Sequence, residues 1–174
     1  MTATPEATVL ALQEAWNARD LGRYVSMLTD DVEWFDMGMM HPPARGRQAV
    51  RAFSESILAA FPDFTYVIEH PICVSPDGKR CIALWKITAT HTGVLNPPGF
   101  APTLRQASFH GVDILEFQNG LVSRITTLFD VVATAEQLTG LPLRFPAGSF
   151  RERFAVFLQR IVAFFARRRP PHAA

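Results

Sequence analysis

The last apolar run in the folded part of the chain is interrupted by a carboxyl group, that of Asp130. Asp130 follows Leu128-Phe129 and precedes Val131-Val132, and burial among such residues raises the pKa of a carboxyl. A neighbouring acid such as Glu116 would raise the pKa of one member of the pair further. A carboxylate poised nearer neutral pH can remove a proton from a carbon between two carbonyls. We therefore expect Asp130 to be a general base. The alternative is a cap on the following helix, whose dipole favours negative charge there.

Three more side chains are candidates to act with this base. His110 and His91 could protonate a developing enolate oxygen or orient the substrate, although a single histidine on a strand is often structural. Asp36 follows Trp34-Phe35 and is either a second acid or a solvent-exposed residue at a strand end. The predicted catalytic residues are Asp130, Glu116, His110, His91 and Asp36.

The alternation of side chains along a strand predicts which residues share a face with Asp130. If Asp130 points inward, Thr126 and Leu128 on its strand do as well, and Glu116 does so across the hairpin turn. The expected pocket is aromatic and aliphatic with a few acids and two imidazoles, which is typical of a small-molecule site. Its predicted lining residues are Trp34, Met40, Trp85, Ile114, Thr126 and Leu128.

Near residue 64 the spacing of apolar residues changes from that of helices to that of strands, and these elements must position the candidate residues. Apolar residues at helical spacing predict helices from Pro5 to about Arg19, around Tyr24 to Leu28, and from Arg47 until Pro62 stops the third. Strands are predicted for Val32–Asp36, Phe64–Val74, Arg80–Thr92, Arg105–Phe117 and Leu121–Val131, with a tight hairpin at Asn119-Gly120. Helices followed by a meander of strands indicate an α+β fold, with a curved antiparallel sheet wrapped around the N-terminal helices.

Several segments in this order resemble the SnoaL-like polyketide cyclases of the NTF2-like superfamily. They are Ala59–Asp63, Thr90–Gly93, Gly111–Leu115 and Asp130 with Glu136–Leu138, and the resemblance covers roughly residues 8–143. It implies a cone of strands that is open at one end and closed on its concave side by helices. The superfamily includes aldol cyclases, hydroxylases, ketosteroid isomerases and epoxide hydrolases, so the fold alone does not choose a reaction.

The resemblance also implies roles for individual positions. The cyclases carry an aspartate base on the last strand, which Asp130 matches, and a histidine fourteen residues earlier, where this chain has Glu116. The epoxide hydrolases need an Arg-x-Asp pair on a central strand, where this chain has Ala89-Thr90-His91. Epoxide hydrolysis is therefore the weakest of the reactions considered.

Charge and composition exclude several other classes of function. Residues 1–143 carry 10 Lys and Arg against 15 Asp and Glu, whereas a nucleic-acid groove would put excess positive charge on the folded domain. The five histidines have no metal-ligand spacing and no Gly-rich phosphate loop occurs, so we predict neither a metal nor a cofactor. Met1–Glu6 does not read as a secretion signal, and the expected location is the cytoplasm.

Residues 144–174 form an extension of different character from the 1–143 domain. They carry seven Arg and one acid, Glu152. Ser149 and Glu152 fit a helix capping box, and the following stretch places Phe150, Phe154, Phe157, Leu158, Ile161, Phe164 and Phe165 on one broad face. We expect this amphipathic helix to pack on its own domain or on a second subunit; the alternative is peripheral membrane contact through residues 149–169.

These patterns predict a small enzyme without a cofactor that binds an apolar small molecule and forms a homodimer. The expected chemistry is proton abstraction from a polyketide-like or other carbonyl substrate. The enzyme would be a cyclase or an isomerase, and so would belong to the lyase or isomerase class. The contrasting hypothesis is a ligand-binding module of the same fold with no catalysis. The identity of the substrate does not follow from the residues.

Overall fold

The computed structural model describes residues 3–38 and 42–166, apart from the side chains of His70, Val162 and Phe165. The chain divides into two compact units, residues 1–141 and 142–174. The first unit opens with helices α1 (Pro5–Asn17) and α2 (Leu21–Ser26), strand β1 (Leu28–Asp36), the short β2 (Ala44–Arg45) and helix α3 (Arg47–Ala60). It continues with strands β3 (Thr65–Val74), β4 (Arg80–Thr90), β5 (Gln106–Gln118) and β6 (Leu121–Phe129), and ends with helix α4 (Val131–Thr139). The second unit holds helix α5 (Phe150–Ala166).

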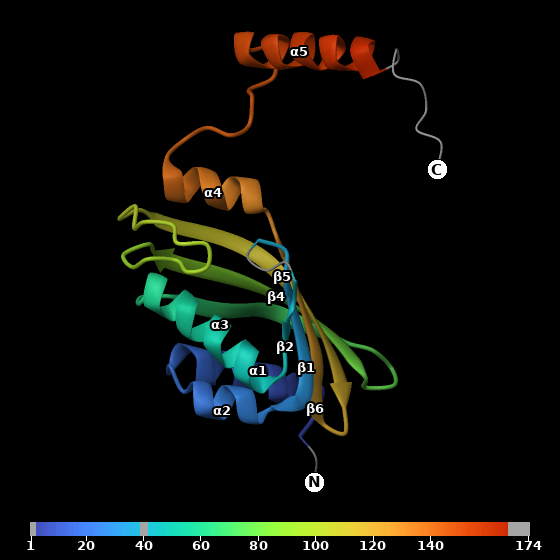
Figure 1. Cartoon of the computed structure of the whole chain (residues 1–174). Helices are drawn as coiled ribbons and strands as arrows, with labels where there is room; N and C mark the ends of the chain where they lie inside the picture. The colour runs from blue at the N-terminus through green and yellow to red at the C-terminus, as the bar shows by residue number, and fades with distance from the viewer. Residues whose placement is uncertain (1–2, 39–41, 167–174) are drawn as a thin grey trace. The chain divides into compact units, whose positions relative to one another are not determined.

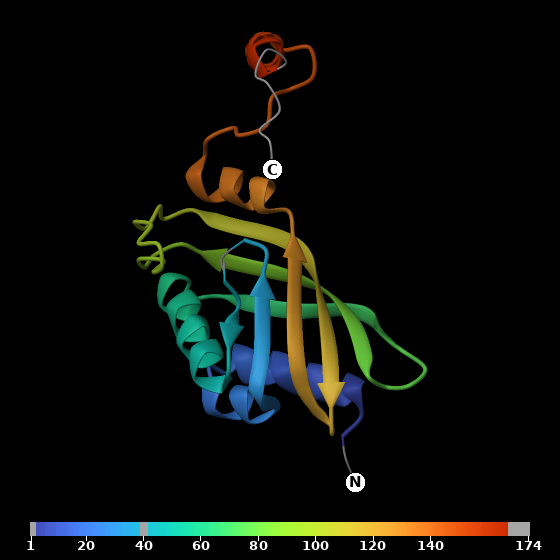
Figure 2. The same cartoon turned by 45° about the vertical axis from the view of Figure 1, so that its right-hand side comes forward.

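One curved sheet organises the first unit. Its strand order is β2-β1-β6-β5-β4-β3, and all neighbours are antiparallel except β1 and β6. Helices α1, α2 and α3 lie on the concave side of the sheet (Figures 1 and 2). We call this the inner face and the opposite side the outer face. The predicted α+β architecture is confirmed, including the curved antiparallel sheet.

Local signals in the sequence explain where the elements begin and end. Thr4 caps α1 by accepting a hydrogen bond from the Ala7 N–H, at 3.2 Å from N to Oγ1, and Pro5 occupies the first helical turn. Asn119 and Gly120 adopt positive φ angles of 53° and 81°, as a tight turn between two twisted strands requires. The turn joins β5 to β6 in the register that the site depends on.

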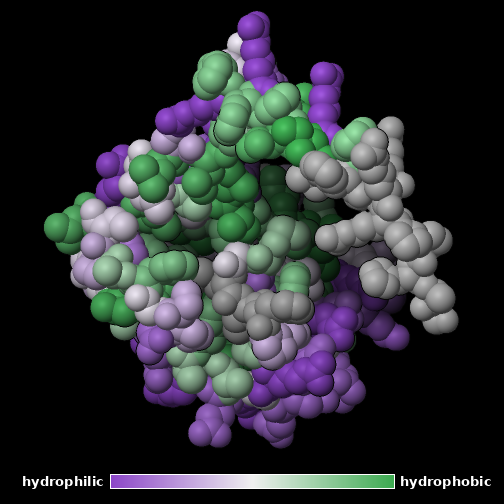
Figure 3. Space-filling view, turned by 45° about the horizontal axis from the view of Figure 1, so that its top comes forward, coloured by the Kyte–Doolittle hydropathy of each residue, from purple (hydrophilic) through white to green (hydrophobic). Residues whose placement is uncertain are grey.

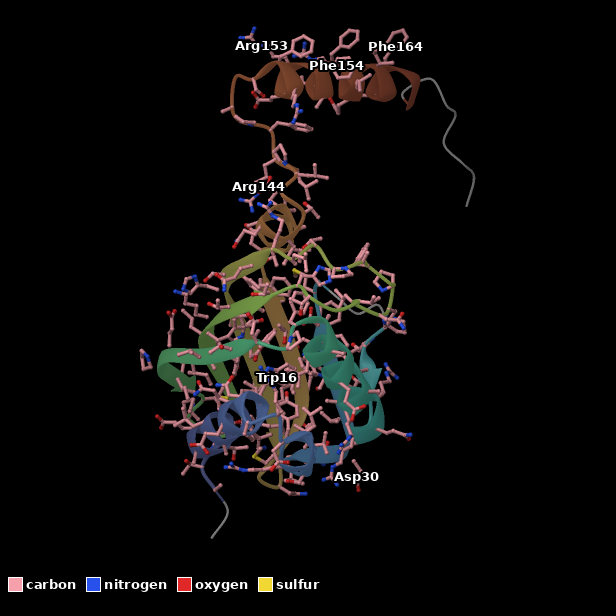
Figure 4. All side chains as sticks on the ribbon, turned by 90° about the vertical axis from the view of Figure 1, so that its left-hand side faces the viewer. Trp16, Asp30, Arg144, Arg153, Phe154 and Phe164 are labelled. Atoms are coloured by element: carbon pink, nitrogen blue, oxygen red, sulfur yellow. The ribbon has the colours of Figure 1, made fainter. Side chains whose placement is uncertain are left out.

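Aromatic residues fill the space between the helices and the sheet. Trp16 of α1 lies in the interior of the first unit (Figure 4), with its ring 5.5 Å from Tyr24, 6.1 Å from Trp34 and 5.4 Å from Phe64 between centroids. The edge-on geometry of these pairs is the arrangement that ring quadrupoles favour. This cluster holds α1 and α2 against the sheet.

The surface also carries hydrophobic residues in broad areas rather than as single spots, as the face in Figure 3 shows. On the outer face, Val67, Ile82 and Leu84 are 47%, 41% and 49% exposed. These residues form an exposed apolar patch on β3 and β4, which we call the outer patch, and the predicted homodimer stays a prediction. No helix within the described ranges is long and apolar enough to span a membrane.

Candidate active site

A cavity of about 520 Å³ lies within the first unit, between the inner face of the sheet and the helices. Its wall is mostly apolar and draws on α1, α3, α4 and every long strand. Such a volume and lining are typical of a site for a small organic molecule. The aromatic residues in the wall are Trp16, Tyr24, Trp34, Phe61, Phe64, Tyr66, Trp85, Phe100, Phe109 and Phe129.

Asp113, in the middle of β5, puts a carboxyl group into this cavity. The residue keeps some accessible surface because the cavity itself admits solvent, but the carboxyl lies deep inside the protein. Burial raises the pKa of Asp113, while hydrogen bonds from Thr127 and Tyr66 and the nearby Trp85 indole N–H act in the opposite direction. Asp113 is thus a carboxyl with a raised pKa in an apolar pocket.

A chain of hydrogen bonds holds the Asp113 carboxylate in place. Thr127 Oγ1 donates to Asp113 Oδ1 at 2.8 Å, and Tyr66 donates its hydroxyl to Oδ2 at 3.0 Å. The Trp34 indole N–H in turn donates to Thr127 Oγ1 at 2.9 Å. Each carboxylate oxygen therefore has its own donor, which fixes the orientation of the group toward the cavity.

A row of three residues on the inner face crosses the middle of the sheet. Asp36 of β1 pairs with Thr127 of β6, which pairs with Asp113 of β5. Neighbouring strands lie about 4.8 Å apart, so the Cα atoms of the two aspartates are roughly 10 Å apart. Asp36 is 6% exposed and accepts the Gly38 N–H at 2.9 Å. The sheet therefore presents two carboxyls to one cavity with a hydroxyl between them.

His91 follows β4 and lies against the wall of the same cavity. It is 3% exposed, and its ring stacks on Phe61 at 5.0 Å between centroids. Burial lowers the pKa of His91, and a hydrogen bond involving the Gly93 backbone offsets this in part. Nδ1 lies 3.3 Å from Thr103 Oγ1. The imidazole is therefore neutral near pH 7 and can offer only one N–H at a time.

Three buried nitrogen atoms in the cavity wall lack a hydrogen-bond partner within the described part of the chain: Trp16 Nε1, Trp85 Nε1 and His91 Nε2. The Trp85 indole is near enough to Asp113 to favour the charged carboxylate, but its distance and angle do not meet those of a hydrogen bond. Buried polar groups are rarely left unpaired in proteins. These positions therefore mark where a ligand with oxygen atoms would gain most: both indoles need an acceptor, and His91 Nε2 can pair with a hydroxyl in either tautomer.

Gly111 makes room for the Trp85 ring in the floor of the cavity. The two residues are partners across β4 and β5. A Cβ atom at position 111 would lie 2.2 Å from the Trp85 ring and 2.7 Å from the Leu128 carbonyl oxygen, distances that no real side chain adopts. The absence of a side chain at this inner-face position is what allows Trp85 to lie beside Asp113.

The predicted catalytic residues divide between the two faces. Of the residues predicted for the site, the structure places Asp36, His91, Trp34 and Trp85 in the wall of the cavity. Met40 lies outside the described residues. The prediction for the last two strands was wrong, because Ile125, Thr127 and Phe129 of β6 face the cavity and the residues between them face outward. The residues that this inversion moves to the outer face or its edge are Asp130, Glu116, His110, Ile114, Thr126 and Leu128.

The three displaced titratable residues have partners outside the cavity. Asp130 is exposed at the end of β6, where its Oδ1 accepts the Ala133 N–H at 2.9 Å and caps α4. Glu116 lies 3.5 Å from Arg80 across the outer face, and His110 lies 3.5 Å from Glu69. The helix-capping alternative for Asp130 is the one that the structure bears out.

Sequence reasoning missed the residues that surround the buried carboxyl, namely Asp113, Thr127 and Tyr66. One signal for Asp113 was present, because it is a lone acid between Val112 and Ile114 in the middle of a predicted strand. An acid at such a position either faces solvent or faces a functional cavity. No local signal in the sequence indicated that Thr127 or Tyr66 would contact it.

Comparison with known proteins identifies the family of this architecture. The SnoaL-like domain model matches residues 9–125. A protein named as a SnoaL-like polyketide cyclase from Jannaschia sp. CCS1 is 19% identical with a TM-score of 0.69, over 82% of this chain and 99% of that one. IdmH from Streptomyces antibioticus, named as a polyketide cyclase, is 23% identical with a TM-score of 0.66, over 80% and 100% of the two chains.

One structural relative carries a different name for its activity. AclR from Streptomyces galilaeus, named as a hydroxylase, is 26% identical with a TM-score of 0.63, over 78% of this chain and 96% of that one. No curated protein sequence matches the chain. The likeness to the solved structures under 25% identity establishes the fold, and the reaction has to be argued from the cavity.

Proposed function

The chain belongs to the SnoaL-like domain family, and we propose that it is a cofactor-independent enzyme of the cyclase or isomerase type in which Asp113 transfers a proton. One observation carries the proposal. Asp113 has a raised pKa and lies deep in an apolar cavity, and each of its carboxyl oxygens is oriented by a donor, from Thr127 and Tyr66. A carboxylate in such surroundings is a suitable base for a carbon acid near neutral pH.

The proposed reaction begins at a carbon next to a substrate carbonyl. The Asp113 carboxylate takes a proton from this carbon, and the electron pair moves into an enolate. Trp85 lies beside Asp113 with an indole N–H that lacks an acceptor in the described part of the chain, so it is placed to donate to the enolate oxygen. In an isomerase, Asp113 returns the proton to a different carbon. In a cyclase, the enolate carbon attacks a second carbonyl of the same molecule, and the alkoxide that forms takes the proton back from Asp113.

The residues of the cavity wall indicate which class of substrate would bind. The wall is largely apolar and aromatic, and its buried nitrogen atoms without a partner among the described residues are the donors Trp16 Nε1 and Trp85 Nε1, and His91 Nε2, which donates or accepts according to the tautomer. A substrate that satisfies them has a flat or cyclic hydrocarbon skeleton with carbonyl or hydroxyl oxygens at several positions. A polyketide-like compound fits this description. Asp36, in the same row of the sheet, is the candidate for a second acid that serves a more distant oxygen.

The test measures proton abstraction without knowledge of the natural substrate. The probe is 2-tetralone, an aromatic ketone whose α-protons exchange for deuterium in D₂O, followed by NMR. Binding is followed in parallel through quenching of Trp16, Trp34 and Trp85, because all of these line the cavity. Asp113→Asn keeps the shape of the side chain. It should lower the exchange rate by about 10²–10⁴-fold, the usual contribution of a general base, with little change in the Kd for the ketone.

Asp130→Asn is the matched control, because Asp130 is an exposed helix cap outside the cavity. It should exchange 2-tetralone at the rate of the unaltered protein. Equal rates for the unaltered protein and Asp113→Asn, with binding intact in both, would favour the alternative of a ligand-binding protein without catalysis.

A further inference from the structure

We propose that helix α5 binds the surface of an anionic phospholipid bilayer and lies parallel to it, so that it anchors the chain peripherally. The observation behind this proposal is a row of exposed aromatic residues on α5 that is bordered by arginines. The proposal concerns the second unit alone and is independent of the reaction in the first.

The apolar face of α5 is large and exposed. Phe150, Phe154 and Phe157 are 81%, 51% and 56% exposed, and Leu158 and Ile161 are 45% and 38% exposed. Successive residues of an α-helix are 100° apart, which brings these five side chains onto one side of the helix. The rings of Phe150 and Phe154 stack with centroids 6.3 Å apart, and Figure 4 shows Phe154 and Phe164 on the same side of the ribbon.

Arginines stand at the borders of this face rather than opposite it. Arg153 and Arg160 precede Phe157 and Phe164 by four residues, so both lie along one edge of the aromatic row. Arg151 lies near the other edge. Arginines at these positions can extend their guanidinium groups to lipid phosphates while their alkyl stems cover apolar surface. The opposite side of the helix carries the small or polar residues Ala155, Gln159 and Ala163, with Val156 beside them.

The charge of the segment selects an anionic surface. Residues 142–174 contain seven arginines, three of them at positions 167–169, and a single acid, Glu152. Glu152 is engaged at the start of the helix, where its backbone N–H donates to Ser149 Oγ at 3.2 Å and its carboxylate accepts the Gly148 N–H. The one negative charge is therefore held at the helix N-terminus. Each arginine near an anionic membrane contributes to binding.

The spread of the arginines along α5 determines its orientation. Arg151 and Arg160 are nine residues apart, which corresponds to about 13 Å along the helix axis. Both guanidinium groups reach the headgroup layer together only if the helix lies in the plane of the surface.

A second copy of the chain fits this face less well. Two α5 helices packed through their aromatic rows would bring their arginine borders side by side, and α5 contains no acid beyond Glu152 to pair with them. Like charges along such a seam oppose association.

The experiment is flotation of the full chain with vesicles of phosphatidylcholine alone or with 30% phosphatidylserine. We expect binding only to the anionic vesicles and release at high salt, because the attraction between exposed charges is screened. The double variant Arg153→Gln/Arg160→Gln should raise the apparent Kd by about 25-fold, from about five-fold for each arginine. Phe157→Ser should raise it by about tenfold.

Two matched controls accompany these variants. Arg23→Gln/Arg45→Gln removes two exposed charges of the first unit, and Val156→Ser removes a 44% exposed apolar side chain from the opposite side of α5. Both should bind as the unaltered chain does. Equal binding to neutral and anionic vesicles, or no binding to either, would overturn the proposal. The proposal would also be overturned if Phe157→Ser lowered the mass of the protein in solution or the thermal stability of the first unit. Either result would mean that the aromatic face of α5 packs against protein.

Discussion

The indole N–H of Trp34 donates to Thr127 Oγ1 at 2.9 Å, and this contact determines how Thr127 meets Asp113. A threonine hydroxyl has one proton to donate. Because Thr127 already accepts from Trp34, its proton is directed to Asp113 Oδ1, 2.8 Å away. The arrangement favours the charged carboxylate over the neutral acid. Trp34 is thus a positioning residue that acts on Asp113 through Thr127.

Trp34→Phe should therefore raise the pKa of Asp113, because Thr127 becomes free to accept a hydrogen bond from the neutral carboxyl. The acid limb of the pH profile for 2-tetralone exchange should move to higher pH, while the rate at high pH changes less. Trp16→Phe is the control, since Trp16 Nε1 has no hydrogen-bond partner in the described part of the chain. A profile that stays in place in Trp34→Phe would show that Thr127 keeps its orientation without the indole.

Asp113 should lower the stability of the fold that contains it. A carboxyl whose folded pKa lies above its unfolded value, here near 3.8, favours the folded state only while it is protonated. The free energy of unfolding should therefore decrease as pH rises through 3.8 and the raised pKa, and the deficit should persist at neutral pH. Asp113→Asn removes this ionisation and should be more stable than the unaltered protein at pH 7 but not at pH 3.

Urea unfolding at both pH values measures this difference. A lower urea midpoint for Asp113→Asn at pH 7 would mean that its hydrogen bonds to Thr127 and Tyr66 outweigh the cost of burying the charge.

His91 should make the first unit sensitive to mild acid. Its folded pKa is lowered from the usual 6.5, chiefly by burial, so protonation is easier in the unfolded chain. Stability is therefore complete above pH 6.5 and should fall as pH drops below it. His91→Phe retains a ring to stack on Phe61 and should flatten the stability curve between pH 7 and 5.

Urea unfolding across this pH range measures the effect. If the curve of His91→Phe kept its slope, the acid sensitivity would have to come from another group.

The outer patch of β3 and β4 makes a prediction about assembly. If the chain forms a homodimer through Val67, Ile82 and Leu84, Leu84→Asp should bring a charge into the interface and halve the mass measured by light scattering. Leu10→Asp, at a leucine of α1 that is 41% exposed, should leave the mass unchanged. A dimer that survives Leu84→Asp would place the interface elsewhere.

The sequence predicted the elements of the first unit closely because their signals are local. Pro62 follows the end of α3, Asn119-Gly120 marks the β5–β6 turn, and the period of the apolar residues changes where the helices give way to strands. Each of these signals depends on a few neighbouring residues. The segments that resemble the family also occur in the family's order along the chain, and that order is sufficient to predict the fold.

The side of the sheet that each residue faces was harder to predict, because it depends on strand phase. Leu128 and Phe129 are both apolar, so alternation alone does not show which of them is buried. The phase also changes near the hairpin, where the pairing register shifts between Glu116 and Phe117. A shift of one residue turns every side chain to the other face. Alternation alone therefore points Asp130 inward and overlooks Asp113.

The contact between Gly111 and Trp85 has a consequence for how the cavity could be remodelled. The floor beside Asp113 is built from a ring that reaches over from the neighbouring strand, with no side chain of its own at position 111. A smaller ring at position 85 would not by itself admit a side chain at position 111, because the added Cβ would also lie 2.7 Å from the Leu128 carbonyl oxygen of the neighbouring strand. Position 111 is therefore fixed as glycine by the backbone of β6 as well as by the ring. Directed evolution of ligand selectivity in this scaffold would need to vary position 85 while it keeps Gly111.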